Sequence, residues 1–167
     1  MRRALPWVVV WLSSGCMSMM GDLQAGPVSS TRFEEGRYGV AAQAALGAAL
    51  GETRTSEHLG PGGDMRVKVT RDVKQVAIGP HVYLLASSLT TPYARFGSTL
   101  LEVGSVDDDL TVGALGPRAE VGAFFTPFVI SAFAEYDLRW THQPHEGFVG
   151  LTVGIGQAVS TAPLHSD

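Results

Sequence analysis

Apolar and polar or small residues alternate with a period of two over most of the chain beyond residue 37. This pattern is typical of β-strands, because successive side chains of a strand point to opposite faces of the sheet. Residues 128–140 illustrate it, since Ile130, Tyr136 and Leu138 alternate with Glu135 and Asp137. The alternation predicts six strands, over residues 38–50, 76–87, 93–103, 111–125, 128–140 and 147–157.

The first of these segments also has a second interpretation. Residues 38–50 carry Tyr38, Val40 and Leu46 on one parity, but they are rich in Ala, which has the highest helix propensity and a weak preference for strands. The period of two favours a strand, and an Ala-rich helix over residues 41–50 is the alternative.

The connections between the strands indicate how they are arranged. Short turns at residues 89–92 and 125–127 are expected on one rim, and longer polar connections at residues 52–64, 104–109 and 141–146 on the other. Over residues 37–159 the chain resembles the small bacterial outer-membrane β-barrels by this pattern. The resemblance implies an all-β fold, a small antiparallel up-and-down β-barrel of 6 to 8 strands. Residues 65–70 and part of residues 23–32 are the candidates for further strands.

The charged residues of the strands share one face. In a membrane barrel this face lines the lumen, where each charge needs a partner because a lone buried ion costs several kcal/mol. We therefore predict a lumen charge network, with His81 and Tyr83 beside it, formed by Glu102, Arg118, Glu120, Glu135, Asp137 and Arg139. A structural plug is favoured over a proton or ion path. The alternative arrangement is a soluble barrel with its apolar face inside.

The start of the chain predicts export. Arg2 and Arg3 precede an apolar run over residues 4–12, followed by small residues, which is the pattern of a cleaved signal peptide over residues 1–15. Ser14, Gly15 and Cys16 are similar to the lipobox of bacterial lipoproteins. This resemblance implies cleavage before Cys16, acylation of its thiol and anchoring in membrane lipid. It also implies sorting to the outer membrane, because the residue after the cysteine is Met17 and not Asp.

The expected domain organisation follows from this leader. Residues 16–32 are predicted to form a lipidated spacer and residues 33–167 the β-barrel domain. Cys16 is the only cysteine, which excludes an internal disulfide.

Composition narrows the possible functions. Only 17% of the 167 residues are charged and 45% are hydrophobic, which argues against disorder and a coiled coil. The net charge is −4, and loss of Arg2 and Arg3 with the leader would make the chain more acidic. Nucleic acid is therefore not an expected partner.

We find no catalytic, nucleotide-binding or zinc motif and predict no enzyme, cofactor or metal. His142 and His145 fall short of the usual three or four zinc ligands, and residues 107–109 lack the spacing of a calcium loop. A catalytic pair of Glu102 and Glu135 is disfavoured. The expected function is a structural or interaction role for an exported lipoprotein barrel, at the outer membrane or on the periplasmic face of the bacterial envelope. The alternative is a periplasm-facing soluble barrel that binds a small apolar ligand.

Overall fold

The computed structural model describes residues 16–30, 38–51, 57–71, 73–86, 91–106, 109–113, 115–140 and 145–160. These residues form an all-β fold. The strands are β1 (Cys16–Ser30), β2 (Tyr38–Gly51), β3 (Glu57–Thr70), β4 (Val73–Ala86), β5 (Thr91–Ser98), β6 (Leu101–Val106), β7 (Asp109–Gly113), β8 (Pro117–Phe125), β9 (Phe128–Asp137) and β10 (Glu146–Ser160). The described part of the chain contains no helix long and apolar enough to cross a membrane.

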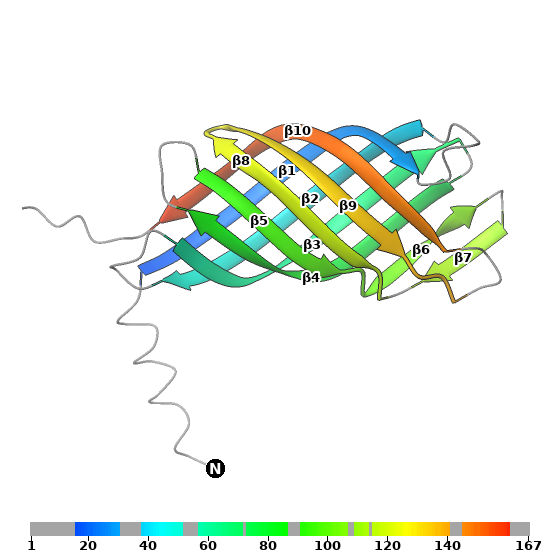
Figure 1. The fold of residues 1–167 in the computed structure, drawn as a ribbon, viewed down its shortest axis with the longest axis horizontal. Helices are drawn as coiled ribbons and strands as arrows, with labels where there is room; N and C mark the ends of the chain where they lie inside the picture. The colour runs from blue at the N-terminus through cyan, green and yellow to red at the C-terminus, as the bar shows by residue number, and fades with distance from the viewer. Residues whose placement is uncertain are drawn as a thin grey trace, which may run out of the picture.

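The strands close into an antiparallel barrel (Figure 1). Their order is β3-β2-β1-β10-β9-β8-β5-β4, and β4 pairs back with β3 to complete the ring. Every strand is strongly tilted, as closure of a sheet into a barrel requires. The predicted small antiparallel barrel is thereby confirmed.

Two of the barrel strands are interrupted, so the ring has eight strand positions. β4 pairs with β5 through residues 81–85 and with β6 through residues 73–78, which makes β5 and β6 one long strand with a break at Thr99. β7 and β8 form the returning strand, and backbone hydrogen bonds of Thr99 to Leu115 and Gly116 hold the two breaks together. The predicted segments 93–103 and 111–125 match these two composite strands, and residues 38–50 form a strand and not a helix.

Prolines within the strands lie where one neighbouring ladder is interrupted. Pro27 falls between the β1–β10 pairs Ala25↔Val153 and Val28↔Gly150, and Pro61 falls in the corresponding gap between β2 and β3. Pro80 lies where β4 changes its partner from β5 to β6. Because proline has no N–H to donate, these gaps explain how a barrel without free edges accommodates it.

The barrel has two unequal rims. The termini rim, where Cys16 pairs with Gly51 and Ser18 with Ser160, also carries the connections 52–56, 87–90 and 126–127. The loop rim carries the other connections, 31–37, 71–72, 107–108 and 138–145. The expected short turns do share one rim, but the placement of residues 52–64 was wrong. Residues 57–64 belong to β3, and residues 52–56 lie outside the described residues.

The expected spacer over residues 16–32 is also wrong for its greater part. Residues 16–30 form β1, which pairs with β2 along its whole length and with β10 on the other side. The barrel therefore begins at Cys16 and not at residue 33. The predicted signal peptide over residues 1–15 and the chain end at residues 161–167 lie outside the described residues.

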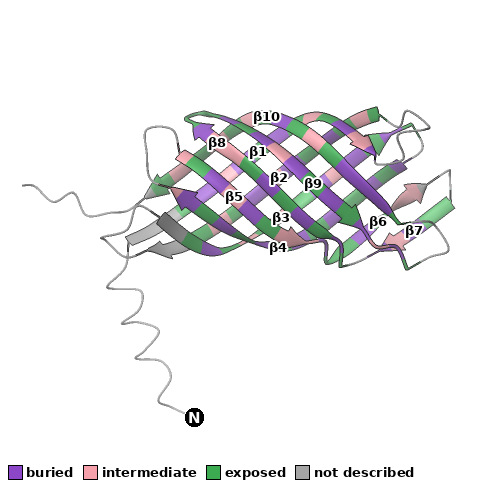
Figure 2. Ribbon diagram, in the orientation of Figure 1, coloured by how far each residue is buried: buried purple, intermediate pink, exposed green. Residues whose placement is uncertain are grey.

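The alternation along each strand becomes a division between inside and outside (Figure 2). β4 alternates buried and exposed residues along almost its whole length, with Gln75 and Tyr83 inside and Val76 and Leu84 outside. Exposed aromatic residues mark both rims of the outer surface. They are Phe125 and Phe128 at the termini rim, and Tyr38, Tyr136 and Trp140 at the loop rim. The outer surface between them carries aliphatic residues and one further aromatic, Phe96.

Candidate functional site: the lumen charge network

The lumen is filled by ionic and amide side chains whose positions are set by the inward parity of the strands. Five bases and seven acids point into it. They are Arg66, Lys68, Arg95, Arg118 and Arg139, and Asp22, Asp64, Glu102, Glu120, Glu135, Asp137 and Glu146. Among the charged residues whose side-chain exposure the structure describes, Arg71, Lys74 and Asp109 face outward instead, and they lie at the loop rim.

Glu135 on β9 is the centre of the network. Its Oε1 lies 2.9 Å from Arg66 Nη1 and 3.4 Å from Lys68 Nζ, and it accepts a hydrogen bond of 3.1 Å from Thr99 Oγ1. Its Oε2 accepts a hydrogen bond of 2.9 Å from Arg118 Nη1. Three cations therefore surround one carboxylate, and the break in the strand at Thr99 directs a hydroxyl group to it.

Glu120 on β8 is a second centre, nearer the termini rim. Arg95 Nη1 donates to Glu120 Oε1 at 3.1 Å and Arg118 Nη2 donates to Glu120 Oε2 at 2.9 Å. Tyr93 Oη donates to Oε1 at 2.7 Å, and Gln43 Nε2 lies 3.0 Å from the same atom. Arg118 thus bridges the two centres, and the network continues to Asp22 through its ion pair with Arg95.

A third group of charges lies towards the loop rim. Lys68 Nζ pairs with Asp137 Oδ2 and lies 3.8 Å from Glu102 Oε2. Arg139 Nε lies 3.6 Å from Glu102 Oε1, and Arg139 Nη1 donates to Glu146 Oε2 at 3.2 Å. Lys68 links this group to Glu135, so the ionic network extends through most of the barrel's length.

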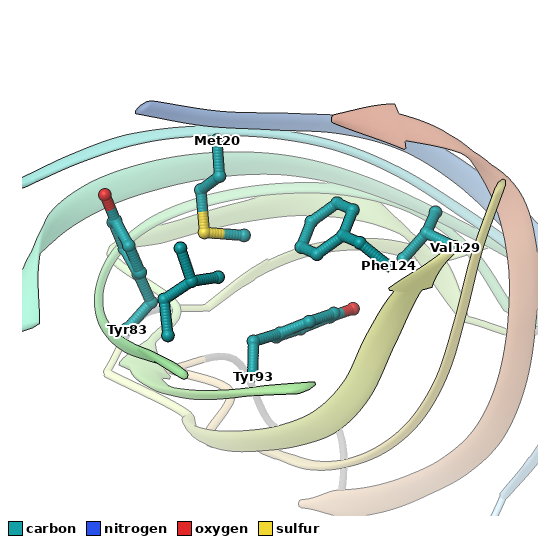
Figure 3. Packing of buried hydrophobic residues seen from close by; sticks show 6 residues of the cluster. Met20, Tyr83, Tyr93, Phe124 and Val129 are labelled. Atoms are coloured by element: carbon teal, nitrogen blue, oxygen red, sulfur yellow. The ribbon is translucent and has the colours of Figure 1, made fainter. Parts of the chain in front are cut away.

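Apolar clusters flank the charges. Met20, Tyr83, Leu85, Tyr93, Phe124 and Val129 form one cluster near the termini rim, where the labelled side chains converge inside the ring of strands (Figure 3). A second cluster contains Phe133 and Phe148. The Arg118 guanidinium lies 4.3 Å from the centre of the Phe133 ring, and Lys68 Nζ lies 4.2 Å from that of Phe148. Such cation–π contacts stabilise a desolvated cation.

All six residues of the predicted network lie in the lumen, and the structure brings them together through partners that the sequence analysis did not include. Arg118 contacts both Glu120 and Glu135 directly, and Arg139 contacts Glu102. Asp137 joins the others through Lys68. The lumen charges absent from the prediction are Asp22, Asp64, Arg66, Lys68, Arg95 and Glu146. His81, expected beside the network, has its Nδ1 3.0 Å from Asp64 Oδ2.

The structure describes only some of the residues considered for a catalytic pair or a metal site. Glu102 and Glu135 share Lys68 as a neighbour, at 3.8 and 3.4 Å. His145 accepts a hydrogen bond from the Arg139 amide, whereas His142 and residues 107–108 lie outside the described residues. Among the described residues, no group of three or more His, Cys, Asp or Glu is arranged to hold a metal.

Comparison with known proteins agrees on the fold. No protein-family model and no curated protein matches the sequence. The outer membrane enzyme PagL superposes with a TM-score of 0.57 at 13% identity, over 81% of this chain and 97% of its own. Neisserial surface protein A (NspA) superposes with a TM-score of 0.51 at 12% identity, over 85% and 97%. At these identities the likeness shows a shared barrel fold and transfers no activity.

Proposed function

We propose that this chain spans the bacterial outer membrane as a sealed eight-stranded barrel, and that it serves a structural or interaction role in the envelope and not catalysis or conduction. The observation that carries the proposal is the complete segregation of the described charges. Among the charged residues whose side-chain exposure is described, those inside form a paired network and those outside lie at the loop rim. A water-facing strand surface would carry polar and charged residues along its length.

The height of the apolar outer surface fits a bilayer. Phe128 and Tyr136 lie eight residues apart on β9, about 26 Å along a strand at about 3.3 Å per residue, or about 20 Å vertically at a tilt of about 40°. Outer-membrane barrels present an apolar band of about 25 Å between aromatic girdles.

The lumen supports a sealed barrel and not a channel or a binder of apolar ligands. The cavity beside Gln43, Arg66 and Glu135 measures about 10 Å³, room for a single water molecule. Sites for drug-sized ligands usually measure about 300–1,000 Å³ and are mainly apolar. The surroundings of Glu135 are instead ionic, so an apolar ligand would have to displace paired charges.

A lipid on Cys16 remains part of the proposal. Cys16 is the first residue of β1, at the termini rim, so a diacylglycerol on it would add a lipid anchor at that rim. Anchoring would then have two contributions, acyl chains at about 0.8 kcal/mol per buried methylene and the barrel itself. In the Cys16→Ala variant we expect lost incorporation of labelled palmitate, with the protein still requiring detergent for extraction.

An arginine scan of the outer surface tests the membrane-spanning proposal. Leu151 pairs with Ala132 midway between the aromatic rims and is 61% exposed, whereas Leu110 lies at the loop rim and is 73% exposed. In lipid vesicles we expect Leu151→Arg to lower the free energy of unfolding by about 2–4 kcal/mol and Leu110→Arg by about 0–1 kcal/mol. If both changes are neutral and the protein stays folded without detergent, Leu151 faces water and the proposal fails.

A further inference from the structure

Two carboxyl groups inside the loop-rim end of the barrel lie against each other. The Glu102 and Asp137 side chains are within hydrogen-bonding range, and the residues are 1% and 2% exposed. Lys68 Nζ lies beside both, paired with Asp137 Oδ2 and 3.8 Å from Glu102 Oε2. Two ionised carboxylates in contact repel each other strongly where water is excluded, so this contact requires an explanation.

The strand arrangement makes the two acids neighbours. Glu102 on β6 pairs with Gly113 on β7, and Gly113 forms a β-bridge with Arg139, just beyond the end of β9. Asp137 precedes Arg139 by two residues and shares its inward face. Because Gly113 contributes no side chain, none stands at this position between Glu102 and the end of β9. The contact therefore follows from the register of the strands.

The described charges around the pair have an excess of one acid. Five charged side chains form the group at the loop-rim end, and they are the acids Glu102, Asp137 and Glu146 and the bases Lys68 and Arg139. An uncompensated charge at such burial is strongly destabilising.

The side chains that reach the group from neighbouring positions do not correct this excess. Gln75 on β4 is neutral and donates to Glu102 Oε1 at 2.6 Å. Glu135 on β9 lies 3.4 Å from Lys68 Nζ, but it is itself an acid and already pairs with two arginines. The group is thus left one positive charge short.

The hydrogen bonding of the pair is incomplete in the same way. In the described part of the chain, Glu102 Oε2 and Asp137 Oδ1 are buried oxygens without a hydrogen-bond partner. An ionised carboxylate only accepts hydrogen bonds, so two facing carboxylates cannot satisfy each other, whereas a protonated carboxyl donates one. A single proton therefore supplies both the missing donor and the missing positive charge.

We propose that Glu102 and Asp137 share one proton in the folded barrel at neutral pH. Both acids ionise at neutral pH in the unfolded chain, so folding takes up this proton. As the pH rises, the unfolding equilibrium then shifts by up to about tenfold per pH unit towards the unfolded state. The pair thus makes the loop-rim end of the barrel sensitive to alkali. The inference concerns the lumen and does not depend on membrane insertion.

The Glu102→Gln variant of the full chain tests the proposal through urea unfolding. Its amide has nearly the shape of the protonated acid and keeps a donor beside Asp137 at every pH. At neutral pH we expect its unfolding equilibrium constant to stay within about threefold of that of the wild type. Glu120→Gln is the matched control, because it removes a carboxylate that pairs with Arg95 and Arg118, and it should raise the constant at least about 100-fold.

The pH dependence separates a shared proton from a merely tolerated substitution. From about pH 7 to pH 9, the unfolding constant of the wild type should rise relative to that of Glu102→Gln, by up to about tenfold per unit. Infrared spectra of the folded wild type in D₂O at neutral pH should show the C=O stretch of a protonated carboxyl. This band should be absent from Glu102→Gln and Asp137→Asn and present in Glu120→Gln.

Three results would overturn the proposal. One is a wild-type spectrum without a protonated-carboxyl band at neutral pH, a measurement that needs no variant to fold. Another is a band that persists in folded Glu102→Gln, because it then belongs to a different acid. The third is a Glu102→Gln barrel that is as unstable as Glu120→Gln or does not fold, since the charge of Glu102 is then required.

Discussion

Replacing Glu135 by glutamine tests whether the lumen network stabilises the barrel. The amide has nearly the shape of the carboxylate, so packing is preserved while the charge shared by Arg66, Lys68 and Arg118 is removed. The Glu135 side chain is 0% exposed, so water does not screen the three cations from one another. The amide NH₂ would also place a donor against one of them.

The expected loss is large. Removing one partner of a buried ion pair destabilises a protein by about 3–5 kcal/mol, or roughly 150- to 5,000-fold in the unfolding equilibrium. Urea unfolding in lipid vesicles, followed by tryptophan fluorescence and by the gel mobility of unheated samples, measures it. A further change of Lys68 to methionine removes one of the three cations but also the partner of Asp137, so the loss in the double variant should be smaller than the sum of the two single losses by at least about 1 kcal/mol. A loss below about 1 kcal/mol for Glu135→Gln, or strict additivity of the two changes, would refute the reasoning.

Three further changes probe the barrel wall. Leu115 has a φ of 63°, in the left-handed region that costs a non-glycine residue about 1–2 kcal/mol, so Leu115→Gly should stabilise the barrel by about 0.5–1 kcal/mol in urea unfolding. Gly47→Val should destabilise it, because an added Cβ would overlap the buried Tyr83 ring, and the unheated gel species should melt at a lower temperature. Phe124→Ala should remove about 3–5 kcal/mol from the cluster near the termini rim, with a matching fall in the urea midpoint.

Six barrel strands were predictable because their outward positions are large and apolar and their inward positions are not. β1 and β3 were predicted only in part, as the candidate segments 23–32 and 65–70, because tertiary contacts override the local signals of the rest. β3 contains Gly60, Pro61, Gly62 and Gly63, which in isolation indicate a turn. In the barrel an added Cβ at Gly62 would overlap the His81 ring of the neighbouring strand, so the glycine is a packing requirement and not a turn.

The sequence predicts which face of a strand each charged residue occupies, but it does not predict which acid pairs with which base. The inward positions of Arg66 and Lys68 are visible in their alternation with Met65 and Val67 within the candidate strand 65–70, but the predicted charge network did not include them. Which acid faces which base depends on the stagger between strands distant in sequence. Lys68 and Asp137, for example, lie 69 residues apart. Alternation defines the two faces of each strand but leaves this stagger undetermined.

The apolar outer surface and the ionic lumen together specify the register of every strand. A slip of β8 by one residue would turn Arg118 and Glu120 outward and bring Ala119 and Val121 into the network. In the proposed membrane-spanning arrangement, each charge turned towards lipid at mid-depth would cost up to about 2–4 kcal/mol, and each former partner would lose its counter-charge. Glu135 would be left with Arg66 and Lys68 alone. A lumen of charges is thus a weaker source of net stability than an apolar core, but it heavily penalises a misregistered barrel.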